Sequence, residues 1–141
     1  MKYKGITVKK KPNFWNFLPW LSSYTAQAFF SKIYVSEEIF DNLKSKKPKP
    51  RSIATLEHER KHIERQKELG PINFGIRYIF SPEFRFSEEL LAIKESMKYL
   101  KRKGLDFDIE RAAGFLSSRL YFWMTSYDKA RRELERIWKE I

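Results

Sequence analysis

The stretch that decides the fold is SIATLEHERKHIERQKEL, residues 52–69, which Gly70 and Pro71 follow. Its apolar residues Ile53, Leu56 and Ile63 fall on one face of a helix, and its charged residues cover another face. Glycine followed by proline is a common signal that a helix has ended. The stretch therefore predicts an amphipathic helix that packs one face on the rest of the domain.

Within this predicted helix, His58, Glu59 and His62 form the pattern His-Glu-x-x-His. Residues four apart lie one turn above each other, with Cβ atoms about 5 to 6 Å apart, so two imidazoles can bind one Zn²⁺ at about 2.0 to 2.1 Å. Glu59 lies at the flank of such a metal, where its carboxylate can take a proton from bound water. No other histidine occurs in the chain. We predict a metal site here; the alternative is two surface histidines placed together by chance.

A hydrolytic zinc site takes three protein ligands and one water. Because the chain has no cysteine and no further histidine, the third ligand must be a carboxylate. Glu89 is favoured over Glu88, since it falls within the apolar stripe of a predicted helix over 82–103, where a buried carboxylate needs a cation. If that helix instead begins at Ser87, both glutamates lie in an exposed first turn. Weaker candidates are Glu83, Glu95, Asp106, Asp108 and Asp128.

The segments TLEHERKH (55–62) and SEELLA (87–92) together resemble the gluzincin zinc metallopeptidases, and by size the minimal single-domain kind. The resemblance covers about 29–100 and implies that His58, His62 and Glu89 bind Zn²⁺. It also implies that Glu59 is the general base of a peptidase, accepting a proton from metal-activated water and passing it to the leaving amine. A peptide or protein substrate would lie along an edge strand at 29–35.

Two features depart from this family. No further histidine is available to stabilise the oxyanion, so Arg77, Tyr78, Tyr121 and Tyr127 are the candidates for that role. The chain also leaves little polypeptide for substrate pockets, so a silent or latent zinc protein is an alternative. In that form the last helix, with Trp138 and Ile141, would pack over the cleft.

The rest of the sequence predicts one domain, 1–141, of the α+β class and predominantly α. Residues 1–50 form a basic, aromatic strand region, and residues 51–141 are helical. The further elements expected are strands at 6–8 and 29–35, an aromatic packing loop at 13–24, a helix at 36–43 capped by Ser36, and helices at 109–124 and 126–140 that follow the one capped by Ser81.

The net charge is +11, and it is unevenly distributed along the chain. Residues 1–51 carry 11 basic and 3 acidic side chains, with basic runs at Lys9–Lys11 and Lys44–Arg51. Solvated loops are the favoured interpretation of these runs, and nucleic acid or an acidic membrane surface is the alternative partner. The sequence has no apolar run long enough for a transmembrane helix and no evident signal peptide, so a cytoplasmic protein is expected.

Overall fold

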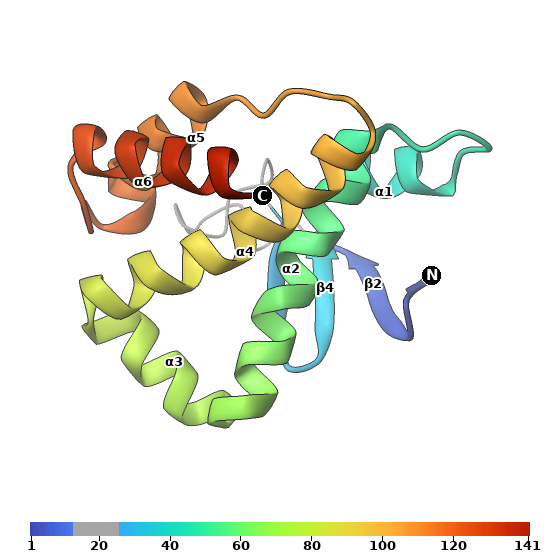
Figure 1. Ribbon diagram of the computed structural model, residues 1–141. Coiled ribbons are helices and arrows are strands. Elements are labelled where there is room, and N and C mark those ends of the chain that lie inside the picture. The colour runs from blue at the N-terminus through green and yellow to red at the C-terminus, as the bar shows by residue number, and fades with distance from the viewer. Residues whose placement is uncertain (13–25) are drawn as a thin grey trace.

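The computed structural model describes residues 1–12 and 26–141, so the loop expected at 13–24 lies outside the described residues. Its elements follow in the order β1 (Lys2–Tyr3), β2 (Ile6–Lys10), β3 (Gln27–Phe29), β4 (Lys32–Val35), α1 (Glu37–Lys44), α2 (Pro50–Leu69), α3 (Pro71–Phe80), α4 (Pro82–Arg102), α5 (Ile109–Leu116), the 3₁₀ turn η3 (Arg119–Tyr121) and α6 (Tyr127–Glu140). Figure 1 shows a small sheet beside a larger helical body, which confirms the α+β, predominantly α class.

The strands form one sheet in the order β1-β2-β4-β3, in which β2 and β4 are parallel and the outer pairs are antiparallel. The prediction of a single strand at 29–35 is wrong, because the chain turns at Phe30 and Ser31, where φ is 45° and 63°. Hairpin turns with positive φ usually carry Asn or Gly, so an aromatic residue hid this one. Among the described strands, β3 rather than β4 therefore lies at the sheet edge.

Serine caps fix the starts of three of the described helices. Ser36, Ser81 and Ser126 each accept a hydrogen bond from a first-turn amide of α1, α4 or α6. The sequence predicted the caps at Ser36 and Ser81. Helix α2 begins at Pro50 rather than at Ser52, because proline suits the first helical position.

Two helical predictions differ from the structure. Helix α3 was not predicted: Gly70, with φ of 84°, ends α2, and Pro71 starts a new helix at once. The single helix predicted over 109–124 is wrong, since α5 stops at Leu116. The hydroxyls of Ser117 and Ser118 donate to carbonyls of its last turn, and such bonds compete with helix continuation.

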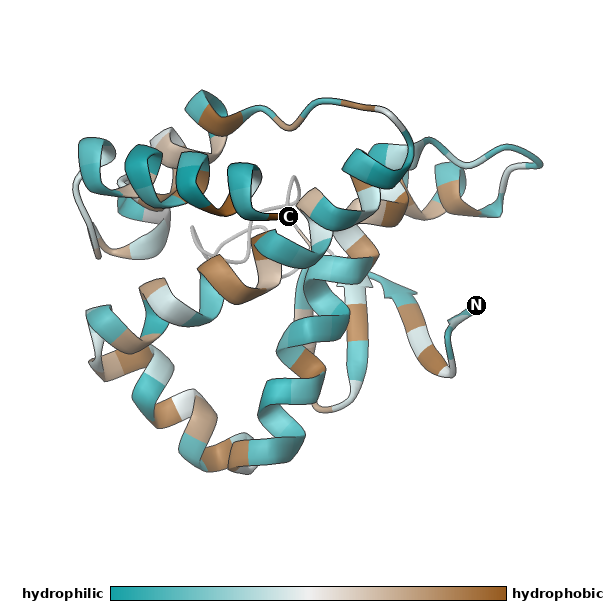
Figure 2. Ribbon diagram, viewed as in Figure 1, coloured by the Kyte–Doolittle hydropathy of each residue, from teal (hydrophilic) through white to brown (hydrophobic). Residues whose placement is uncertain are grey.

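Two apolar clusters meet along α2 and α4, which lie side by side in Figure 1. One cluster packs the sheet on α1 and α2, and the other packs α4 against α5 and α6. Hydrophilic residues predominate on the outer side of α6, as Figure 2 shows. None of the helices in the described ranges carries an apolar run long enough to cross a bilayer. The pair α2 and α4 therefore joins the two halves.

Candidate metal centre

The side chains of His58, His62 and Glu89 converge between α2 and α4. The two imidazole Nε2 atoms lie 3.1 Å apart. His58 Nε2 is 3.2 Å from Glu89 Oε2, and His62 Nε2 is 3.2 Å from Glu89 Oε1. Among the described residues, this is the group of three side chains whose ligand atoms lie close enough together to bind one metal ion.

These distances fit the ligand set of a zinc ion. Ligand atoms about 2.05 Å from one ion at tetrahedral angles lie about 3.3 Å from each other. Glu89 is only 2% exposed and His62 only 7%. Within the described part of the chain, Glu89 Oε2 and His62 Nδ1 make no hydrogen bond of good geometry. A buried carboxylate oxygen left in this way is well suited to bind a cation.

Glu88 has a different partner, and this distinguishes it from Glu89; the sequence had left both as candidates for the third ligand. Arg65 of α2 donates to both oxygens of Glu88, from Nε at 2.9 and 3.1 Å and from Nη2 at 2.7 Å. Of the weaker candidates, Glu95 pairs with Lys98 and Asp108 caps α5. Glu89 is therefore the carboxylate that the fold brings to the histidines.

Burial and mutual charge shift the titration of this cluster. Burial raises the pKa of Glu89, but His62 and His58 outweigh burial and hold it well below its ordinary value. Burial lowers the pKa of His62, but the charge and hydrogen bond of Glu89 outweigh burial and raise the pKa to about 9. Burial raises the pKa of Glu59, and the two imidazoles offset only part of that effect. In the metal-free cluster His62 is therefore the group that holds a proton at neutral pH.

A cavity of about 800 Å³ opens beside the cluster. Its polar end contains His58, Glu59, His62 and Glu89, and Glu59 Oε1 lies 4.0 Å from His58 Nε2. The remaining wall is largely apolar and comes from β3 and its approach, α3, α4, α5 and the turn after it: Ala26, Ala28, Phe74, Ile79, Ile93, Ala112, Phe115, Leu116 and Phe122. The cluster thus borders a cavity whose wall is mostly apolar.

Of the four residues considered for the oxyanion, two line this cavity. The Tyr78 hydroxyl donates to Glu89 Oε1 at 2.5 Å, and the Tyr121 hydroxyl also interacts with Glu89. Burial, followed by the charge of Glu89, raises the pKa of both tyrosines well above the ordinary value. Arg77 lies over the Phe84 ring instead, and Tyr127 begins α6. The cavity therefore retains Tyr78 and Tyr121 as hydrogen-bond donors.

The last helix does not cover the cavity. Helix α6 contributes no residue to the cavity wall, and Trp138 and Ile141 pack against the cluster formed by α4, α5 and α6. The expected plug is therefore not formed by α6 in this structure.

Two residues near the site were not found from the sequence. Arg85 is buried in the cavity wall and donates to the carbonyls of Tyr78, Ile79 and Tyr121. It joins the end of α3 to the turn after α5; its place between two phenylalanines on α4 was the available signal. Lys11 is partly buried, and this burial lowers its pKa to about 8, although the charge of Glu59 acts in the opposite direction.

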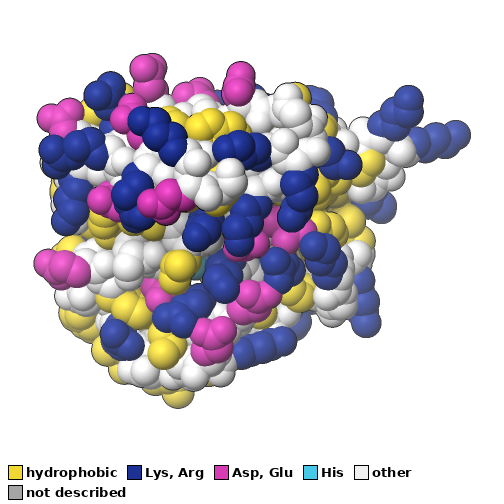
Figure 3. All heavy atoms as spheres, in the orientation of Figure 1, with side chains coloured by type: hydrophobic (Ala, Val, Ile, Leu, Met, Phe, Trp, Pro, Cys, Tyr) yellow, Lys and Arg dark blue, Asp and Glu magenta, His cyan; other side chains and the backbone are white. Residues whose placement is uncertain are grey.

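The two basic segments meet at Phe40, because Lys10 of one and Lys44 of the other both lie over its ring. Lys10 pairs with Glu37 and Asp41 on α1. Figure 3 shows Lys and Arg side chains interspersed with Asp and Glu over much of the visible face, and basic side chains on the projecting loop after α1. A nucleic-acid or membrane partner stays an untested alternative that depends on this loop.

A scan of known protein-family models, a search of curated proteins and a search of solved structures each give no match. The function is therefore argued from the chemistry of the site.

Proposed function

We propose that this chain is a zinc-dependent peptidase of the gluzincin kind, with His58, His62 and Glu89 as ligands and Glu59 as general base. The observation that carries the proposal is the close triangle of two imidazoles and one buried carboxylate at the end of a cavity. Peptides or proteins are the proposed substrates. The cytoplasmic location expected from the sequence belongs to the same proposal.

Zinc held by these ligands would act as a Lewis acid on water and on the substrate carbonyl. Glu59 lies beside the ligands and lines the cavity, so its carboxylate is placed to accept a proton from the attacking water and to pass it to the leaving amine. The Tyr78 hydroxyl orients Glu89 by hydrogen bonding. Tyr121, in the same wall, is the candidate donor to the developing oxyanion.

The substrate backbone can pair with β3, which lies at the edge of the described sheet and continues into the cavity wall through Ala28. Strand addition uses main-chain hydrogen bonds and leaves side chains to fill the adjacent pockets. Gln66 of α2 donates to the Ala28 carbonyl at 3.1 Å and so holds β3 against the helix that carries the histidines.

The test compares wild type, Glu59→Gln and the matched control Glu64→Gln, which changes a glutamate of α2 that pairs with Arg60 and Lys61. All three proteins should bind one equivalent of zinc, measured by elemental analysis after gel filtration. Wild type and Glu64→Gln should cleave a mixed peptide library followed by mass spectrometry, and Glu59→Gln should not. The peptidase proposal would be refuted if every peptide cleaved by wild type were also cleaved by Glu59→Gln, or if wild type cleaved none.

A further inference from the structure

We infer that Arg65 and Glu88 are positioning residues for the metal centre, an inference that rests on the proposed zinc site. Their paired side chains fix α4 against α2 at the point where Glu89 reaches the two histidines. Neither residue belongs to the proposed ligand set. Their effect is exerted through the placement of Glu89.

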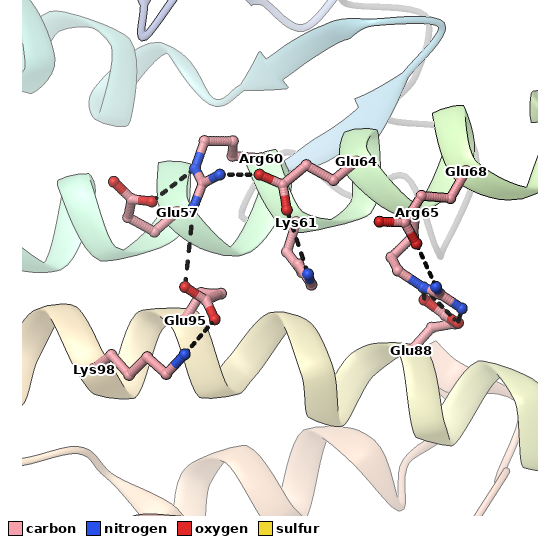
Figure 4. Close-up of polar contacts among 9 residues, drawn as sticks. All are labelled: Glu57, Arg60, Lys61, Glu64, Arg65, Glu68, Glu88, Glu95 and Lys98. Carbon is pink, nitrogen blue, oxygen red and sulfur yellow. Dashed lines mark hydrogen bonds and ion pairs between the residues drawn. The ribbon is translucent and has the colours of Figure 1, made fainter. Parts of the chain in front are cut away.

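The pair has the geometry of a rigid fork. Arg65 Nε and Nη2 together make three contacts of 2.7 to 3.1 Å with the two oxygens of Glu88, as Figure 4 shows. Glu88 is 2% exposed. Glu68 accepts from Arg65 Nη1 at 2.5 Å and holds the guanidinium from its other side. A bidentate pair of this kind constrains both distance and angle.

The pair also lies at the right place along the two helices. Arg65 follows His62 by three residues and His58 by seven, so all three share one face of α2. Glu88 immediately precedes Glu89 on α4. A rotation or slide of α4 that displaced Glu89 from the imidazoles would also break the fork.

A second tie holds the opposite side of the cluster. Ser96 of α4 donates to the Ala54 carbonyl of α2 at 2.7 Å, in the buried part of the contact. Because α2 and α4 are antiparallel, Glu89 and its histidines lie between this bond and the Arg65–Glu88 pair. The cluster is therefore fixed from both ends, and only the Arg65–Glu88 tie adjoins a proposed ligand.

A buried ion pair is a costly way to join two helices, because apolar side chains of similar size often pack as stably. Apolar packing has no preferred angle, however, whereas the fork sets the rotation of α4. A need to hold the carboxylate of Glu89 in one orientation would account for the ion pair at this position.

The experiment replaces the pair by Arg65→Met/Glu88→Leu, which removes both charges together and leaves no buried charge unpaired. A second variant, Arg65→Lys, keeps the charge but loses the fork. The matched control is Glu95→Gln, because Glu95 also pairs across to α2, 3.9 Å from Arg60 (Figure 4), but it is not among the residues of the metal cluster. Zinc affinity is measured by competition with a chromogenic chelator, and coordination by the absorption spectrum of the Co²⁺ protein.

Both Arg65 variants should bind zinc roughly 10- to 100-fold more weakly than wild type, as is typical when an outer partner of a metal ligand is lost. Their Co²⁺ spectra should change, while the metal-free double variant unfolds at or above the wild-type temperature. Glu95→Gln should match wild type in affinity and spectrum. Wild-type affinity in either Arg65 variant, or an equal loss in Glu95→Gln, would overturn this inference alone. A wild type that binds no zinc would overturn the proposed function as well.

Discussion

Excess zinc should raise the midpoint of thermal unfolding by about 14 °C. The ligands come from α2 and α4 and meet only in the folded chain, so zinc should bind the native state preferentially. At a free concentration about 1,000 times the dissociation constant, such binding stabilises by about 4.1 kcal/mol. An unfolding entropy of about 2.1 cal/mol/K per residue gives about 0.3 kcal/mol/K for 141 residues. The ratio of these two quantities is the expected shift.

The shift should grow as the pH rises from 6.5 to 8. In the metal-free protein Glu89 outweighs burial and raises the pKa of His62 to about 9, so zinc must displace a proton throughout this range. Apparent zinc affinity should therefore rise by up to about tenfold per pH unit. A raised His62 pKa also means that its stabilisation of the metal-free fold is complete below about 6.5 and is lost as the pH approaches 9.

The assay is scanning calorimetry with excess zinc or with chelator, at pH 6.5 and pH 8. His62→Ala should abolish the zinc-dependent shift, and Glu64→Gln, outside the cluster, should retain it. The reasoning fails if excess zinc raises the unfolding midpoint of wild type by less than about 3 °C. It also fails if His62→Ala keeps the zinc-dependent rise, or if that rise becomes smaller as the pH increases.

Three other perturbations have defined outcomes. Tyr78→Phe removes a 2.5 Å hydrogen bond to buried Glu89 and should lower the free energy of unfolding of the metal-free protein by about 1 to 3 kcal/mol in urea titrations; an unchanged value would contradict this. The pKa of Glu57 is about 2 because contacts with Lys4, Tyr3 and Arg60 outweigh burial, so its contribution of about 3 kcal/mol, present above pH 4.5, should be lost as the pH falls toward 2. In Glu57→Gln the free energy of unfolding should therefore depend less on pH over that range. A pH profile parallel to that of wild type would contradict the assigned contribution of Glu57. Phe115→Ser, at an exposed part of the cavity wall, should lower kcat/KM for peptides with large apolar residues while shifting Tm by no more than about 2 °C; unchanged selectivity would refute the assigned pocket.

The helices were predictable where their signals are local. A serine before the helical segment marked the starts of α1 and α4, because the cap involves residues only three apart. Gly70 and Pro71 mark both the end of one helix and the start of another, and the sequence was interpreted only as the end of the first. The turn at Phe30 was hidden for a related reason, since only the pairing of β3 with β4 stabilises positive φ in an aromatic residue.

The residues of the candidate site also differ in whether local sequence signals could predict them. His58, Glu59 and His62 lie within one helical turn, so their spacing alone predicts their convergence. The distinction between Glu88 and Glu89 depends on how α4 is rotated against α2, which is a tertiary property. Arg65 was visible in the sequence only as one charge among many on a solvated helix, and its bidentate partner lies 23 residues away.

The charges of the cluster favour a divalent cation. Glu59 and Glu89 are both almost fully buried, at 5% and 2% exposure, so two carboxylates face a region with little solvent to stabilise them. In the metal-free protein a protonated His62 can balance one of them, and burial drives Glu59 toward its neutral form by raising its pKa. A doubly charged ion bound to neutral imidazoles would balance both carboxylates at once and leave Glu59 ionised. Because a base must be ionised to accept a proton, the same ion that Glu89 binds would also favour the form of Glu59 that the proposed reaction needs.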